Sequence, residues 1–202
     1  MSRSNFLLFR SHLDLAHQYW SKLNLKGSIV IDATCGNGHD TLLLCQQTLQ
    51  ENETGLVYAF DNQIEAIQST DQLLKKNLTP QQLSKVFLEK RCHSTFPECI
   101  AKESVELIVY NLGYLPGGNK LKTTLSLTSL ESLTSALPLI KHGGLISVTC
   151  YPGHPEGKEE RLALLNYVNE LSPCEWSCSH HQWINRNQSP SLLLLQRKLS
   201  DA

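Results

Sequence analysis

The stretch SIVIDATCGNGHDT, residues 28–41, decides the fold. Its first six residues, 28–33, form a short apolar run containing Asp32, which is typical of a strand buried on both faces of a parallel sheet. A glycine-containing turn follows, and helical periodicity resumes over residues 39–49. A strand, a tight turn and a helix in this order predict the beginning of an α/β domain.

The same alternation continues along the chain. Further strands are expected over residues 55–60, 85–92, 105–112 and 145–151. Helical periodicity is found over residues 62–76, shortly before residue 101, over 127–140 and over 156–171. Strands that alternate with helices predict a parallel sheet with right-handed crossovers.

The last part of the chain has a different pattern. Two strands are expected over residues 176–184 and 192–198, with no helix between them. Successive strands that are joined by a short loop pair antiparallel. The sequence therefore predicts an α/β fold with a mostly parallel, twisted sheet, helices on both faces and a C-terminal antiparallel hairpin at the edge.

The length and composition predict one globular domain. The chain has 202 residues, of which 41% are hydrophobic and 18% charged. We expect a single domain over residues 1–202, with an N-terminal helix at about 11–25. A cofactor-binding half would occupy about 28–112, and a substrate-side half about 113–199.

Charge and cysteine content exclude several classes of protein. A net charge of −1 argues against a general nucleic-acid coat protein. The seven cysteines lack C-x-x-C spacing, and the Cys and His residues at 174–181 lack a second ligand pair, so we expect reduced thiols and no metal site. No apolar run is long enough to cross a membrane, which favours a cytoplasmic protein.

In an open parallel sheet, ligands bind beyond the carboxyl ends of the strands. Gly36 and Gly38 allow a tight turn against a ligand, and N–H groups at the following helix start can bind a carboxylate. Asp61 ends the next strand about twenty residues on, where an acidic side chain, assisted by Gln63, can hold the ribose hydroxyls of a nucleoside cofactor. Packing of the glycines and helix capping by Asp61 are the structural alternatives.

Two nucleoside cofactors use this geometry, NAD and S-adenosyl-L-methionine. NAD-binding turns usually contain a third glycine, and Thr41 occupies its position here. The ammonium of S-adenosylmethionine needs an anion, which Asp32 can supply. These residues favour S-adenosylmethionine.

The loop NLGYLPGGNK at residues 111–120 is the most specific motif in the chain. Its start has the shape of the Asn-Pro-Pro-Tyr motif of amino-directed methyltransferases. There an Asn amide oxygen and a backbone carbonyl hold the N–H groups of the target, while the aromatic ring packs on the base. Asn111 and Tyr114 are therefore candidates for catalysis through positioning. A Gly/Pro loop with a structural tyrosine is the alternative.

Five segments occur in the order of one family: DATCGNGHDT, FDNQIEAI, CHS at residues 92–94, NLGYLPGG and YPGHPEGKEE. From about residue 13 to 198 the chain resembles the tRNA 5-(aminomethyl)-2-thiouridine methyltransferases, formerly labelled rRNA methylases. The resemblance implies a Rossmann-like class I fold that uses S-adenosylmethionine. The implied reaction is methyl transfer to the exocyclic amine of 5-aminomethyl-2-thiouridine at the wobble position, giving 5-methylaminomethyl-2-thiouridine, with the tRNA anticodon loop as partner.

The motifs and the resemblance together assign two sets of residues. Cofactor binding is assigned to Asp32, Gly36, Asn37, Gly38, Asp40, Thr41, Asp61, Gln63, His93, Ser94 and Asn111. Substrate binding is assigned to Leu112, Gly113, Tyr114, Asn119, Lys120 and Tyr151. Asn119 departs from the family pattern, which has Asp there. Cys35 is expected to be a buried small side chain without a catalytic role.

The amine must be neutral to attack, because an alkyl ammonium has a pKa of about 10. Tyr151, His154 and Glu160 are the candidate proton acceptors, and His154 is assigned to catalysis. Methylation of rRNA or of another amine is the alternative reaction. A dinucleotide-binding oxidoreductase or a non-catalytic binding module would leave the Asn-Leu-Gly-Tyr loop unexplained. The oligomeric state stays open, with a homodimer as one option. A basic rim for RNA is expected from Lys120, Lys122, Lys158 and Arg186.

Overall fold

The computed structural model describes residues 11–50, 54–113, 124–186 and 188–200, and their strands form one sheet in the order β3-β2-β1-β4-β5-β7-β6. The strands are β1 (Ile29–Asp32), β2 (Leu56–Asp61), β3 (Val86–Lys90), β4 (Val105–Leu112), β5 (Ile140–Cys150), β6 (Trp176–His181) and β7 (Ser191–Arg197). The helices are α1 (His12–Trp20), α2 (His39–Thr48), α3 (Ile64–Asn77), α4 (Pro80–Leu83), α5 (Ser126–Ala136), the short 3-10 helix η1 (Leu137–Leu139) and α6 (Pro155–Asn169).

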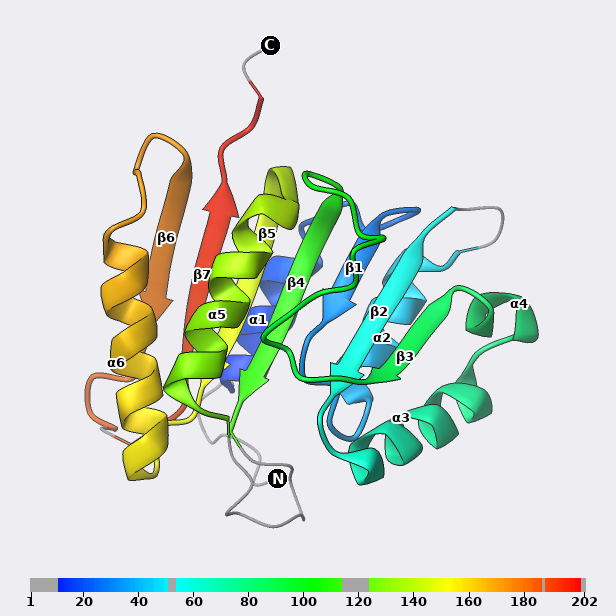
Figure 1. The fold of residues 1–202 in the computed structure, drawn as a ribbon, viewed down its shortest axis with the longest axis horizontal. Helices are drawn as coiled ribbons and strands as arrows, with labels where there is room; N and C mark the ends of the chain where they lie inside the picture. Colours follow the sequence, from blue (N-terminus) through cyan, green and yellow to red (C-terminus); the bar gives the residue numbers. More distant parts are fainter. Residues whose placement is uncertain (1–10, 51–53, 114–123, 187, 201–202) are drawn as a thin grey trace.

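Strands β1 to β5 pair parallel, and β7 pairs antiparallel with both β5 and β6 (Figure 1). Helices carry the chain back from β1 to β2, from β2 to β3 and from β4 to β5, and the connection from β3 to β4 at residues 91–104 returns without a helix. No helix separates β6 from β7, so the chain returns antiparallel. The predicted α/β fold with a C-terminal hairpin is confirmed.

Helices cover both faces of the sheet. Helices α1, α2 and α3 pack on one face, where Trp20, Leu44 and Leu74 contact strand residues such as Val109. Helices α5 and α6 cover the other face, visible in front of the sheet in Figure 1, and contribute side chains such as Leu133 to a second core cluster. Both faces of the central strands are therefore buried, as their continuous apolar sequence predicts.

Several predicted boundaries differ from the structure. Helix α1 ends at Trp20 rather than near residue 25, where the backbone turns and Gly27 adopts a positive φ of 67°. Residues 91–104 contain no helix where one was predicted, and Pro97 instead accepts a turn hydrogen bond from Ile100. Strand β5 begins at Ile140 because Ile140 already pairs with Val105.

Helix α4 was not predicted. It is a single turn that begins with a capping box between Thr79 and Gln82, with Pro80 at the first helical position. No helix among the described residues is long and apolar enough to cross a membrane.

We expect Gly38→Ala to destabilise the fold by on the order of 2 kcal/mol. Gly38 has a φ of 82°, and an added Cβ would lie 2.9 Å from Thr70 Cα, where α2 and α3 meet. Chemical unfolding would measure the change. Gly153→Ala is the matched control, because the carbonyl oxygen of Gln188 would lie 4.0 Å from an added Cβ. Equal stability of the two variants would contradict the packing argument.

Candidate active site

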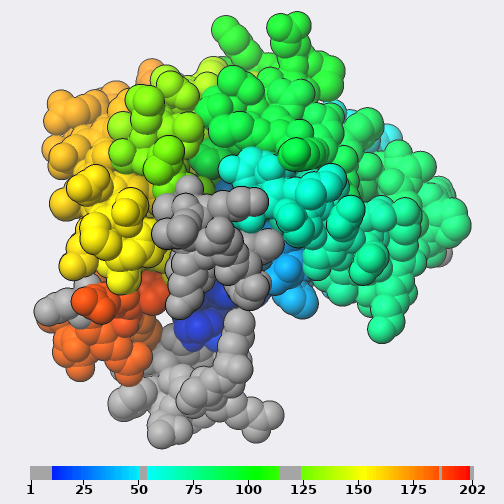
Figure 2. All heavy atoms as spheres, turned by 60° about the horizontal axis from the view of Figure 1, so that its bottom comes forward, coloured from blue at the N-terminus to red at the C-terminus, as the bar shows by residue number. Residues whose placement is uncertain are grey.

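The carboxyl ends of β1 and β4 form the crevice of the sheet. Strand β1 lies between β2 and β4, and the chain leaves β1 through α2 on one face but leaves β4 toward α5 on the other. This reversal of strand order opens a crevice in which ligands of α/β sheets bind. These ends point downward in Figure 1, and Figure 2 turns the same edge toward the viewer.

The glycine turn after β1 is held against the end of β2. Cys35 N donates to Phe60 O at 2.8 Å, and Gly36 N donates to Asp61 Oδ2 at 3.1 Å. The turn is also held from α3, because Thr70 Oγ1 donates to Gly36 O. Gly36 and Gly38 both have positive φ, so the turn takes a shape that other residues rarely adopt. Cys35 is buried, as predicted, and burial raises the pKa of its thiol.

Asp61 organises two backbone segments at once. Its Oδ1 accepts from Gln63 N at 2.9 Å while its Oδ2 accepts from Gly36 N. The carboxyl is half-buried, and burial raises its pKa despite these hydrogen bonds. The N-cap position of α3 is occupied by Gln63 and not by Asp61, so the structural alternative of Asp61 as a helix cap is wrong. Asp61 instead joins the glycine turn to the residue that precedes α3.

Asp32 is a fully buried carboxyl group. It accepts from Thr41 Oγ1 at 2.6 Å and from Thr34 N at 3.2 Å. Burial and, next, the negative charge of Asp40 raise its pKa to about 7. A positive charge brought close to Asp32 would favour its ionised form.

Asn111 is held in one orientation. Its Nδ2 donates to Asp40 Oδ2 at 2.7 Å, and its backbone N donates to Thr34 Oγ1 at 2.7 Å. A carboxylate only accepts hydrogen bonds, so the amide must turn its nitrogen toward Asp40. Among the described residues, Asn111 Oδ1 has no hydrogen-bond partner although it is buried. The site therefore presents one oriented acceptor at the end of β4.

Helix α1 contributes two histidines that the sequence motifs did not indicate. His17 Nε2 lies 2.7 Å from the Oδ1 of Asp40, on the carboxylate that holds Asn111. His12 Nε2 lies 3.1 Å from the hydroxyl of Tyr151. No motif marks these histidines, and only the packing of α1 on the sheet brings them to the crevice.

Gly113, which follows β4, packs against Tyr151, which follows β5. An added Cβ at Gly113 would lie 3.4 Å from the ring of Tyr151, so the two are in close contact. Burial raises the pKa of Tyr151 to about 12, which keeps its hydroxyl protonated near neutral pH. The side chain of Leu112 lies in the core and is 2% exposed. Tyr114, Asn119 and Lys120 lie outside the described residues.

His93 lies beneath α5 rather than in the open crevice. It is 7% exposed, its carbonyl accepts from Ser132 Oγ, and its Nε2 lies 3.4 Å from Ser129 Oγ. Burial lowers the pKa of His93 to about 4, so the ring is neutral. Ser94 is also tied to α5, since its carbonyl lies 3.5 Å from Ser135 Oγ.

His154, which precedes α6, and Glu160 on α6 both have structural partners. His154 caps the helix, because its Nδ1 accepts from Gly157 N at 3.1 Å. Glu160 accepts from Ser129 Oγ at 2.6 Å and from Thr124 Oγ1 at 2.9 Å, and burial raises its pKa. Thr124 N in turn donates to Gly113 O. Glu160 therefore supports Thr124, which in turn contacts the end of β4 through Gly113. A role of His154 in proton transfer stays a prediction.

Comparison with known proteins identifies relatives across most of the chain. The model of the family described as "Putative rRNA methylase" matches residues 57–197. A chloroplastic tRNA (mnm5s2U34)-methyltransferase of Arabidopsis thaliana is 39% identical over 188 residues, which are 92% of this chain and 69% of the plant protein.

Two solved structures are also similar. A protein from Clostridium thermocellum described as a "putative rRNA-methylase" has a TM-score of 0.85 at 30% identity, and the match covers 94% of this chain and 98% of that one. A protein from Streptococcus mutans in complex with SAH, described as "a putative methyltransferase", has a TM-score of 0.79 at 30% identity, and the match covers 94% of this chain and 99% of that one.

The pKa of Asp32 predicts a pH dependence of stability. Its ordinary pKa is 3.8 and its folded value about 7, so between these values the folded state binds a proton that the unfolded state lacks. Stability from this group is therefore full below pH 4 and is lost as pH rises toward 7. The free energy of unfolding of Asp32→Asn should therefore fall less between pH 4 and pH 7 than that of the unaltered protein, by on the order of 2–4 kcal/mol.

Urea unfolding at several pH values measures this difference. Asp71→Asn is the control, because Asp71 is a half-exposed carboxylate that pairs with Lys75 on α3. Parallel stability curves for the unaltered protein and Asp32→Asn would contradict the assignment.

Proposed function

Because this chain belongs to the rRNA methylase family, we propose that it methylates the exocyclic amine of 5-aminomethyl-2-thiouridine at the wobble position of tRNA, using S-adenosylmethionine. The product would be 5-methylaminomethyl-2-thiouridine. The name of the plant relative, which is 39% identical, supports this modification.

One observation carries the proposal: Asn111 presents a buried, oriented Oδ1 that has no partner among the described residues. A buried acceptor without a hydrogen bond costs free energy, so its presence in a crevice favours a ligand that donates. An amine bound there would donate one N–H to Oδ1. Its lone pair would then point in a fixed direction, and such positioning accounts for much of the acceleration in group transfer.

The residues of the crevice fit S-adenosylmethionine. When bound, this cofactor supplies an electrophilic methyl group on a positively charged sulfonium. Asp32, Asp40 and Asp61 bring three carboxyl groups to the crevice. Burial raises the pKa of Asp32, and the charges of Asp40 and Asp61 raise it further. A cationic ligand relieves this repulsion. The glycine turn at Gly36 and Gly38 leaves room for the backbone to approach it.

We propose three roles for the cofactor ligands. Asp61 would accept hydrogen bonds from the ribose hydroxyls of S-adenosylmethionine. The carboxylate of Asp32 would attract the ammonium of its methionine part. The segment that contains His93 and Ser94 would border the adenine. Asn37, Thr41 and Gln63 would be the other cofactor ligands. All of these residues belong to the cofactor-binding half, residues 28–112. Residues 113–199, with Tyr114, Asn119 and Lys120, would form the substrate side.

The RNA partner would be the anticodon loop of a tRNA. Bases in a loop are unpaired, so a wobble uridine can enter a crevice that a base pair could not. A location in the cytoplasm and a homodimeric state stay predictions from the sequence.

The test of this function is to incubate the protein with S-adenosylmethionine and tRNA from cells that lack it. Digestion and mass spectrometry should then detect 5-aminomethyl-2-thiouridine gaining one methyl group. Ribosomal RNA treated in the same way is the comparison for the alternative substrate. A methyl group found only on rRNA would reject the tRNA assignment.

We expect Asn111→Ala to reduce methyl transfer at least about tenfold, a loss of about 1.4 kcal/mol in barrier stabilisation. The variant removes the acceptor that orients the amine, while Asp32 and Asp61 remain in place. Cofactor binding measured by calorimetry should therefore stay nearly unchanged. If methyl transfer and cofactor affinity fell by the same factor, the role assigned to Asn111 would be rejected.

We expect Asp40→Asn to lower the single-turnover rate about tenfold, since an amide no longer dictates the orientation of Asn111. Asp40 is then a positioning residue. The decisive comparison is a double-mutant cycle, in which Asp40→Asn should have little further effect in the Asn111→Ala background. Additive losses would show that Asp40 acts independently of Asn111.

A further inference from the structure

We infer that a groove beside the crevice binds a nucleotide adjacent to the methylated uridine in the substrate RNA. The groove has a volume of about 620 Å³ and lies between α1 and the connection from β6 to β7. Its walls include Leu15, Gln18, His181, Trp183, Ile184 and Pro190. This inference rests on the proposed function, because it assigns the neighbour of the proposed target base.

The groove and the crevice share a wall. His12 lines the groove, and its Nε2 lies 3.1 Å from the hydroxyl of Tyr151, whose ring contacts Gly113. Figure 2 shows the orange-red segment around β7 next to the blue α1 on the edge that carries the crevice. A uridine inserted at Asn111 keeps its neighbours covalently attached. The surface next to His12 is therefore placed to meet one of them.

The groove has side chains that suit an unpaired base. Trp183 lies in the wall, and the guanidinium carbon of Arg186 lies 5.1 Å from the centroid of its ring. Ile184 is 93% exposed, which leaves an apolar surface at the rim. Proteins that bind single strands combine aromatic rings, on which bases stack, with nearby cations that meet the phosphates.

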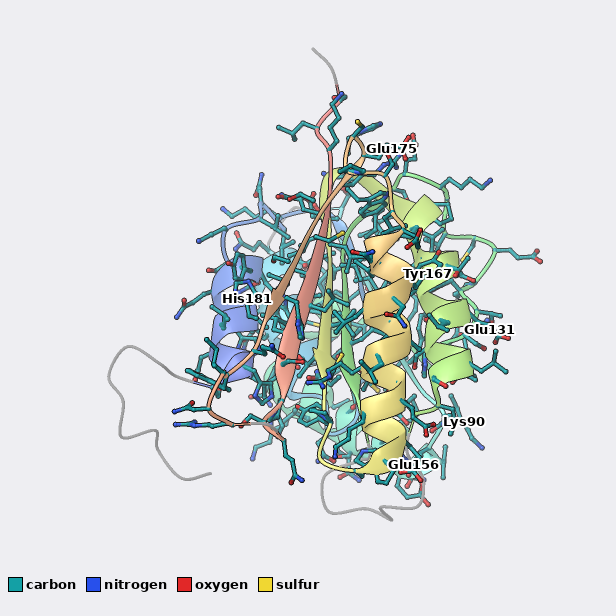
Figure 3. All side chains as sticks on the ribbon, turned by 90° about the vertical axis from the view of Figure 1, so that its left-hand side faces the viewer. Lys90, Glu131, Glu156, Tyr167, Glu175 and His181 are labelled. Atoms are coloured by element: carbon teal, nitrogen blue, oxygen red, sulfur yellow. The ribbon has the colours of Figure 1, made fainter. Side chains whose placement is uncertain are left out.

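The charge of the groove also suits RNA. The described residues that line it include histidines, glutamines and apolar side chains but no Asp or Glu. His181 lies on β6 toward α1, as Figure 3 shows, and its ring packs 5.6 Å from that of Tyr19. Arg186 is exposed at the same end of the hairpin. A phosphate can therefore approach the groove without meeting a carboxylate on its walls.

The volume matches one small ligand rather than an extended partner. Pockets for small organic ligands commonly have volumes of about 300–1,000 Å³, and this groove lies within that range. A single base with its sugar is a ligand of that class. The observations thus favour a nucleotide over a second copy of the chain, which would need a larger contact area.

The test measures RNA binding directly, with S-adenosylhomocysteine present so that no transfer occurs. A fluorescent RNA hairpin that carries an anticodon loop is titrated with the protein. Trp183→Ala should weaken binding about tenfold, whereas Trp183→Phe should retain most of it because a ring remains for stacking. Phe87→Ala on β3 is the matched aromatic control at the opposite edge, since Phe87 is 42% exposed, and it should bind normally.

Crosslinking locates the contact. A photoreactive uridine next to the wobble position should attach to the peptide that contains residues 180–186. Unchanged RNA affinity of Trp183→Ala, or attachment elsewhere, would overturn the inference. A dimer that dissociates in Trp183→Ala while RNA binding persists would also overturn it and identify the groove as a subunit interface.

The same preparations separate this inference from the proposed function. Calorimetry with S-adenosylhomocysteine verifies that each variant retains a folded crevice. If the hairpin crosslinks at the groove but tRNA gains no methyl group, the groove stands and the proposed reaction fails.

Discussion

The parallel pairing of β1 with β2 and β4 is the constraint on which the site depends. Asp32 pairs with Ala59 on one side and with Val109 on the other. Asp61 and Asn111 each lie two residues beyond those partners, so the register brings both to the edge where β1 ends. A shift by one residue would turn these side chains to the opposite face of the sheet. The register therefore places a carboxylate and an amide on either side of one glycine turn.

The crevice concentrates negative charge, and its hydrogen bonds show how the fold tolerates it. Asp32 is stabilised by hydroxyl and backbone donors, Asp61 by two backbone N–H groups, and Asp40 by His17 and Asn111. Unpaired buried carboxylates are costly, and here each receives at least two donors. Burial and, after it, the repulsion from Asp40 still raise the pKa of Asp32. A cationic ligand would lower the electrostatic cost of this cluster of carboxyl groups.

The fold class and the glycine turn after β1 could be predicted from the sequence, because they depend on local patterns. Alternating strands and helices, the missing helix near the C-terminus and the glycine turn are all features of short segments. The burial of Cys35 and the position of Asp61 beside the turn followed from the same reasoning. The helix expected before residue 101 was wrong, since apolar spacing over a short segment with Pro97 does not outweigh turn formation.

By itself, the sequence determined which residues end each strand, and with them the candidates Asp32, Asp61 and Asn111. Only the tertiary structure decided how these residues are connected. His17 and Asp40 meet because α1 packs across the sheet, and their contact spans 23 positions that no local pattern links. The same packing joins His12 to Tyr151 over 139 positions and forms the groove. Strand ends depend on neighbours in the chain, whereas hydrogen bonds between distant elements depend on how helices pack.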